Sequence, residues 1–314
     1  MTSTTTDTAT AKPEIWLTRQ EVILLIMLGV IGALAISVVT LLDRQVAWPV
    51  FIRVVVINFG LMAFGTAIRA YRNMERMGLA MIAVSFYMSF GIFMLILSNS
   101  FFPVVGPIID TQLIEIDAML GYHWAGFVGW LAEYPTLGKL LGAIYTSSLI
   151  QLAILFGVLA WYNSAQQIYH LVACGTVGLA LTMAIWIAIP SFGPSAYQPI
   201  SPEVANAINL FTENAYGATL LDYAKNGIPI ISPETVKATV AFPSFHIIMA
   251  CLSVWFARGT IVFWPVAILN TLMIPATLSH GGHHLIDLIA GVVVFFVALR
   301  ISAWLLKEPR GANP

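Results

Sequence analysis

Long apolar runs dominate the chain, and short polar segments separate them. A helix needs about 20 apolar residues to cross a bilayer. Eight runs approach that length, at roughly residues 21–42, 50–70, 79–99, 138–161, 170–190, 243–257, 260–278 and 283–306. The sixth is short, and the seventh follows it closely. The pattern predicts an all-α fold, a polytopic integral membrane helical bundle with about eight transmembrane helices.

The composition agrees with a membrane protein. Hydrophobic residues make up 59% of the 314, and charged residues only 9%, whereas a soluble domain is about one quarter charged. The net charge of −1 argues against a nucleic-acid partner. Cys174 and Cys251 both lie inside apolar runs, and no Cys-x-x-Cys motif occurs. Both cysteines are therefore expected to be packing residues.

The polar positions outside the apolar runs define the domain organisation. Residues 1–18 are polar and low in complexity, which predicts a disordered cytoplasmic tail rather than a cleaved signal peptide. Residues 19–314 are expected to form a single transmembrane domain. Within it, two long segments, about 100–137 and 191–242, connect spans on the same side. The first carries Tyr122, Trp124, Trp130 and Tyr134, which suit a membrane interface.

The second long segment contains two copies of Ser-Pro-Glu, at 201–203 and 232–234. Each predicts the start of a helix, with serine as the N-cap, proline at the first helical position and glutamate in the first turn. Short helices are therefore expected in this segment, where they could cover a site.

The positions of Lys and Arg predict the orientation. Nine of the fourteen fall on the side that carries both termini if the chain crosses eight times; these are Lys12, Arg19, Arg69, Arg72, Arg76, Arg258, Arg300, Lys307 and Arg310. Basic residues concentrate on the cytoplasmic side of membrane proteins. Both ends are thus expected in the cytoplasm, with the long segments and the active site on the periplasmic side of a bacterial inner membrane.

Two polar stretches interrupt the apolar pattern, "AFPSFH" at 241–246 and "HGGHHLIDLIAG" at 280–291. They hold four of the six histidines. Under the predicted topology each stretch opens a helix at the outer face. A helix N-terminus offers free backbone N–H groups and a partial positive charge, which suit an anion such as phosphate.

His283 and Asp287 are four residues apart, so on a helix they share one face. A carboxylate that binds one imidazole nitrogen leaves the other free to attack as a nucleophile. His246 could then protonate a leaving oxygen, and Ser244 could donate a hydrogen bond to an oxyanion. An acid inside a membrane span is costly and usually functional. These four residues predict a phosphoryl-transfer site that needs no metal.

Other polar residues have simpler explanations. His123 and His170 are expected to be polar residues at the membrane boundary. For His280 and His284, support of the site and a boundary position are equally compatible with the sequence. Asp117 could cap a helix or contact the site, and capping is favoured.

At these stretches the sequence resembles the type-2 phosphatidic acid phosphatase superfamily. "PSFH" matches the family's P-S-G-H motif with Phe245 in place of glycine, and "HHLIDLIAG" matches the core of S-R-x5-H-x3-D. The resemblance, over about residues 110–305, implies a six-helix phosphatase-type core without a cofactor. It implies that His283 forms a phosphohistidine, Asp287 orients it, His246 is the acid and Ser244 binds phosphate.

The family's basic residues are missing. No K-x6-R-P motif occurs, and Ala276 and Thr277 replace the Ser-Arg of the third motif. This pattern is similar to the branch with the inositol phosphorylceramide synthases, which implies a lipid phosphate or phospholipid as substrate and an alcohol such as inositol as acceptor. A phosphate dianion needs compensating charge. Lys237, on the helix predicted to begin at Ser232, is expected to supply part of it, assisted by His280.

Two other interpretations remain open. Histidines and an acid inside spans also occur in a proton-coupled transporter or a lipid flippase, although the chain lacks the paired broken helices of many transporters. The cluster of His280, His283, His284 and Asp287 could instead hold a metal. The metal-free enzyme is preferred because it also explains His246.

Overall fold

The computed structural model describes residues 17–236 and 240–307, and this part of the chain is built from helices. It contains thirteen α-helices and one short 3-10 turn, η1 (Pro194–Ala196). Its one extended pairing is a parallel bridge between Val46 and Ile231. The predicted all-α fold is confirmed. The predicted tail at 1–18 lies outside the described residues except for its last two, of which Thr18 caps the first helix.

Helices occur at all eight predicted spans. They are α1 (Arg19–Leu41), α2 (Trp48–Arg72), α3 (Glu75–Ser100), the pair α6 (Pro135–Thr146) and α7 (Ser148–Trp161), α8 (Ala165–Ala188), α11 (Phe245–Ala257), α12 (Phe263–His280) and α13 (Leu285–Leu305). Among described helices, α1, α2, α3, α8 and α13 are long and apolar enough to cross a membrane. The α6–α7 pair, bent by 52°, makes a sixth if it is one span. Helix α11, with 13 residues, is shorter than a complete crossing requires.

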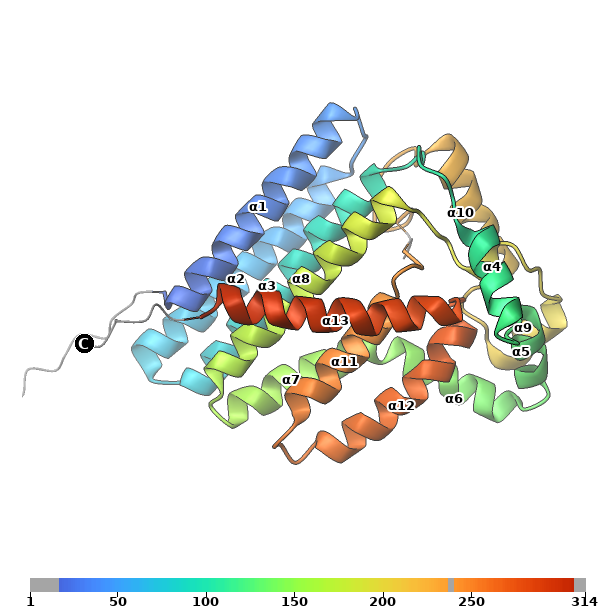
Figure 1. Ribbon diagram of the computed structural model, residues 1–314. Coiled ribbons are helices and arrows are strands. Elements are labelled where there is room, and N and C mark those ends of the chain that lie inside the picture. Colours follow the sequence, from blue (N-terminus) through green and yellow to red (C-terminus); the bar gives the residue numbers. More distant parts are fainter. Residues whose placement is uncertain (1–16, 237–239, 308–314) are drawn as a thin grey trace, which may run out of the picture.

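The long helices lie side by side, and α13 crosses them at an angle (Figure 1). Helix α3 packs against α1, α2, α7 and α8, whereas α13 packs against α8 and α11. The short helices α4 (Asp110–Met119), α5 (Trp124–Ala132), α9 (Pro202–Ile208) and α10 (Asn214–Asn226) gather at the end of the bundle farthest from the described C-terminus (Figure 1). This end also carries the start of α13, and with it the second polar stretch.

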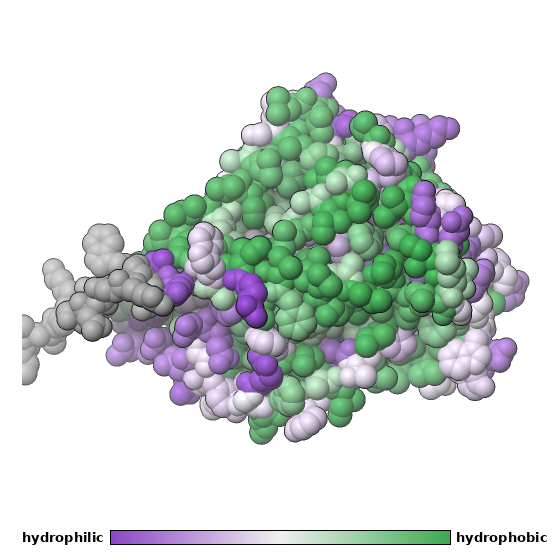
Figure 2. Space-filling view, in the orientation of Figure 1, coloured by the Kyte–Doolittle hydropathy of each residue, from purple (hydrophilic) through white to green (hydrophobic). Residues whose placement is uncertain are grey.

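The surface separates into an apolar middle and polar ends. Figure 2 shows hydrophobic side chains across the middle of the bundle, with hydrophilic side chains near the described C-terminus and at the opposite end. The two described termini meet, because Arg19 Nη1 donates a hydrogen bond to the Lys307 carbonyl at 2.8 Å. Nearby, Arg69 pairs with the buried Glu21 at 2.6 Å. Both termini therefore lie on one side; that this side is cytoplasmic stays a prediction.

Only the first of the two Ser-Pro-Glu copies begins a helix. Ser201 caps α9 and accepts from the backbone N–H of Val204 at 3.4 Å, which confirms the first predicted helix start. The second prediction is wrong, because residues 233–235 form a turn. The Ser232 hydroxyl donates to Glu234 at 2.6 Å instead of capping a backbone N–H. The bridge to Val46 also fixes the chain in an extended conformation just before this turn.

The aromatic residues of the first long segment differ in their exposure. Trp130 and Tyr134 are half exposed on the surface, as an interface position requires. Trp124 is buried, and its indole N–H donates to the Ser279 carbonyl at 3.2 Å. Its expected interface position is therefore wrong. Trp124 instead fixes the end of α12 close to the second polar stretch.

Candidate active site

His283 and Asp287 meet at the start of α13. The helix begins at Leu285, two residues later than predicted, so His283 lies in the turn before it. Asp287 Oδ2 lies 3.0 Å from His283 Nδ1 and accepts the His284 backbone N–H at 2.9 Å. One carboxylate oxygen thus holds both the helix start and the imidazole. Because a carboxylate oxygen only accepts, Nδ1 donates this bond, and in the neutral imidazole Nε2 then keeps its lone pair.

Ser244 joins the start of α11 to this pair. It is the N-cap residue of α11, and its backbone N–H donates to the Asp287 carbonyl at 3.0 Å. Its hydroxyl lies 3.4 Å from His283 Nε2. Gly291 permits this approach, because a Cβ there would lie 2.7 Å from the Ser244 carbonyl oxygen. The two helix starts therefore converge, as the sequence predicts.

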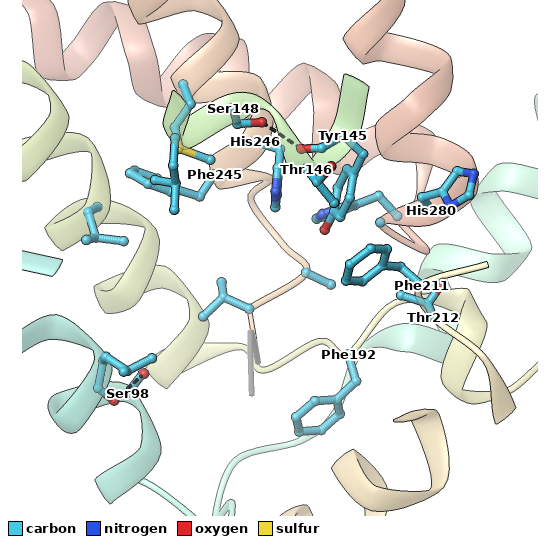
Figure 3. A pocket seen from close by; sticks show the side chains of 18 of the residues that line it. Ser98, Tyr145, Thr146, Ser148, Phe192, Phe211, Thr212, Phe245, His246 and His280 are labelled. Carbon is cyan, nitrogen blue, oxygen red and sulfur yellow. Dashed lines mark hydrogen bonds between the residues drawn. The ribbon is translucent and has the colours of Figure 1, made fainter. Parts of the chain in front are cut away.

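His246 faces the same space from α11. Its ring stacks on Tyr145, with ring centroids 4.1 Å apart and planes inclined by 21°. The ring centroids of His246 and His283 are 6.4 Å apart. Both histidines line a cavity of about 620 Å³. Figure 3 shows the His246 ring beside Tyr145 at the edge of this cavity. Tyr145 was not predicted from the sequence, because it belongs to no motif and is far from His246 along the chain.

Of the predicted phosphate-binding residues, the structure describes Ser244 and His280 but not Lys237. His280 lines the cavity, and its Nε2 lies 2.9 Å from the Gly138 carbonyl. Its Nδ1 has no hydrogen-bond partner within residues 17–236 and 240–307. Lys237 lies outside the described residues, so its role stays a prediction. The described lining contains no Lys or Arg; Ser195 and Thr212 contribute hydroxyl groups instead.

A buried network that no sequence motif marks lies behind the site. His284 Nδ1 lies 2.7 Å from Asp117 Oδ2, and His284 Nε2 lies 3.3 Å from Asp110 Oδ1. Asp110 also accepts from the Ser191 hydroxyl and the Gly193 N–H, both at 2.8 Å. The network therefore ties α4 and the 191–193 segment to the residue after His283. Its signal in the sequence is the seven-residue spacing of the two aspartates, which places them on one face of α4.

Asp117 also caps a helix, although not its own. Its Oδ1 accepts the backbone N–H of Leu285, the first residue of α13, at 3.0 Å. An acidic group at a helix N-terminus is stabilising. Asp117 thus caps a helix, the favoured role, and its other oxygen contacts His284, the residue after His283.

The side chains of the alternative metal cluster point to different partners. His280 contacts the Gly138 carbonyl, and His284 contacts two aspartates. Asp287 binds His283 and the backbone at the start of α13. Within the described ranges, no group of three or more His, Cys, Asp or Glu residues is placed to hold a metal ion.

Comparison with known protein families identifies the chain. A family model described as the PAP2 superfamily matches residues 111–301, well over half of the 314. The chain belongs to the PAP2 superfamily. No curated protein and no solved structure matched. The PAP2 match includes Ser244, His246, His283 and Asp287, whereas α1–α3 precede it.

His284 is a buried cation in this PAP2 chain. Burial lowers its pKa, but hydrogen bonds to Asp110 and Asp117 and the nearby charge of Asp287 outweigh that effect and raise the pKa to about 9. The imidazolium thus lies between carboxylates directly after His283. It offsets acidic charge that would otherwise repel a phosphate.

Stability is expected to fall as the pH rises through about 9. The folded-state pKa of His284 is raised, so its contribution is complete below the unfolded value near 6.5 and is lost above the folded value. Tyr197 faces Asp110, but burial and that carboxylate raise the pKa of its phenol, so it stays neutral across this pH range. The measurement is the apparent melting temperature of the detergent-purified protein between neutral pH and about pH 10.

The matched variant is His284→Asn, which keeps a polar side chain but does not titrate. Its melting temperature should start lower and change less across the same pH range. An equal fall in both proteins would mean that another group controls the pH dependence.

Proposed function

We propose that this PAP2 protein is a membrane-embedded phosphotransferase or phosphatase in which His283 attacks the phosphorus of a lipid phosphate. The proposal rests on the contacts of the His283 ring. Its Nδ1 lies 3.0 Å from Asp287 Oδ2, and its Nε2 lies beside the Ser244 hydroxyl. An oriented imidazole with a free lone pair is what nucleophilic catalysis requires. PAP2 membership supports the coarser statement, a lipid-phosphate phosphatase or phosphotransferase.

The proposed first step forms a covalent phosphohistidine. The lone pair of His283 Nε2 attacks phosphorus, a P–N bond forms, and the bond from phosphorus to the leaving oxygen breaks. His246, across the cavity from His283, is neutral without substrate; it takes up a proton together with the anionic substrate and donates that proton to the leaving oxygen. Asp287 stabilises the positive charge that develops on the imidazole, as an acid does in other nucleophile–orienter pairs.

The second step releases the phosphoryl group. Neutral His246 accepts a proton from water or from an alcohol, whose oxygen attacks phosphorus as the P–N bond breaks. Water gives hydrolysis, and an alcohol gives transfer. We further propose inositol as the acceptor class. The support is that the Lys and Arg of the family motifs are missing, and this pattern is similar to that of inositol phosphotransferases.

The anion would be bound mainly by neutral donors. No described lining residue is Lys or Arg, but the starts of α11 and α13 converge beside His283. Backbone N–H groups at a helix start bind anions; at the start of α13 those of His284 and Leu285 are already bonded to Asp287 and Asp117, so this contribution is assigned to α11. The hydroxyl of Ser244 adds a donor next to Nε2. Lys237 and His280 remain proposed contributors of charge, and the outer membrane face remains the proposed location.

The test is a substrate screen with purified protein in detergent. Phosphatidic acid, polyprenyl phosphates and phosphatidylinositol are supplied with and without free inositol, in the presence of a chelator, and products are identified by mass spectrometry. We expect phosphate release or head-group transfer that the chelator does not prevent. If the protein turned over none of these lipids but moved lipid across liposome membranes, it would be a transporter or flippase and the enzyme interpretation would be wrong.

A further inference from the structure

The cavity that contains His246 and His283 is lined by two kinds of side chain. Beside the histidines lie polar groups, including the Thr212 hydroxyl, which is buried and has no hydrogen-bond partner in the described part of the chain. On α3 and α8 most of the lining is apolar and includes Met94, Leu95, Leu179 and Met183. Figure 3 shows Ser98, on α3, on the opposite side of the open space from His280. A polar site that continues into an apolar space suits an amphipathic ligand.

The cavity opens between α3 and the α6–α7 junction. Gly91, Thr146 and Leu149 line the cavity but are also exposed on the surface, Leu149 to 58%. Thr146 and Leu149 flank the 52° bend between α6 and α7. One turn before Gly91, the Tyr87 ring contacts the Phe156 ring of α7, with centroids 5.7 Å apart. This contact closes the gap between α3 and α7 on that side and defines the boundary of the opening.

The surface around the opening is apolar. Gly91 precedes the last residue of α3, Ser100, by nine positions, which corresponds to about 14 Å along the helix axis. Exposed side chains around it are apolar, among them Met88 at 47% and Ile150 at 62%. A lipid can therefore approach this opening from within the membrane, with its chain still in hydrocarbon.

We infer that one hydrocarbon chain of a membrane lipid phosphate enters the cavity through this opening and lies against α3, and that Gly91 determines which chains fit. The inference rests on the proposed function, because the same lipid would carry the phosphate to His283. A Cβ at Gly91 would have no heavy atom within 4 Å, so a side chain there would occupy the opening without displacing the backbone. Helix α3 lies outside the PAP2 match at 111–301, so this wall is an addition to the family core.

The test is photolabelling in liposomes that contain phosphatidic acid with a diazirine in its palmitoyl chain. We expect label on peptides that contain Met94 and Leu95 of α3 and Leu149 of α7, reduced by excess unlabelled phosphatidic acid. In Gly91→Leu the label at these positions should fall roughly tenfold, as for one added side chain in an apolar pocket. The matched control is Gly60→Leu on α2, an exposed glycine whose Cβ would also have no heavy atom within 4 Å.

Equal labelling of wild type and Gly91→Leu, or label confined to the outer surfaces of α1 and α2, would overturn the inference. The proposed function is tested separately, because labelling requires no turnover. Where turnover is present, a second measurement compares kcat/KM for phosphatidic acids with palmitoyl and hexanoyl chains. Gly91→Leu should lower the ratio of long-chain to short-chain kcat/KM roughly tenfold, and an unchanged ratio would contradict a role in chain selection.

Discussion

Replacement of His283 by alanine should lower kcat/KM for lipid-phosphate turnover by roughly 10⁴- to 10⁶-fold. The variant loses the nitrogen that attacks phosphorus, and the nearest other imidazole, His246, is stacked on Tyr145 with its centroid 6.4 Å from that of His283. A loss of this size corresponds to about 5 to 8 kcal/mol of transition-state stabilisation. The measurement is initial phosphate release by purified protein in mixed micelles.

The control for this variant is His123→Ala. His123 is an exposed histidine that caps α5 and lies outside the cavity lining. It should retain activity close to wild type. Retention of full activity in His283→Ala would exclude His283 as the nucleophile. A loss of folded protein on size-exclusion chromatography would identify a structural defect instead, and His283→Gln would then be the variant to measure.

Asp287→Asn should lower kcat by roughly 10²- to 10⁴-fold, less than the loss of the nucleophile itself. An amide oxygen at the position of Oδ2 would keep both hydrogen bonds, but it lacks the negative charge that stabilises the imidazolium formed in the attack. An amide NH2 at that position would lose the bond to the His284 N–H and would favour the His283 tautomer that carries its proton on Nε2, which removes the attacking lone pair. Initial rates should therefore fall, with a much smaller effect on KM.

Asp222→Asn is the matched control, because Asp222 is an exposed aspartate of α10 that accepts a hydrogen bond from Asn226 at 2.6 Å. Its kcat should remain near that of wild type. If Asp287→Asn kept wild-type kcat, Asp287 would serve only as a helix cap.

The local features of the fold follow from the sequence. Apolar runs of sufficient length predict the long helices, because a bilayer leaves no other partner for backbone polar groups. Ser201 signals a helix start correctly, because its hydroxyl accepts the backbone N–H of Val204. Ser232 carries the same motif, but its preceding residue pairs with Val46, far away in sequence. A local motif does not contain that information, so the second helix start was predicted wrongly.

The contacts of the candidate site are likewise of two kinds, local and long-range in sequence. The contact between His283 and Asp287 is local, and its spacing predicts it. The stacking of Tyr145 on His246 and the contact of Asp110 with His284 join residues far apart in sequence. A single aspartate outside a recognised motif carries no sign of its partner, because tertiary packing alone determines which residues meet. For that reason His284 could not be distinguished from a boundary residue.

The most direct test of the account is to trap the covalent intermediate. The purified protein is mixed with a radiolabelled lipid phosphate, quenched within the first turnover, and divided between alkali and acid. Because phosphohistidine is stable to base and labile to acid, protein-bound label should survive alkali, disappear in acid and be absent from His283→Ala. Label that persists in His283→Ala, or that resists acid in the wild type, would contradict a phosphohistidine on His283.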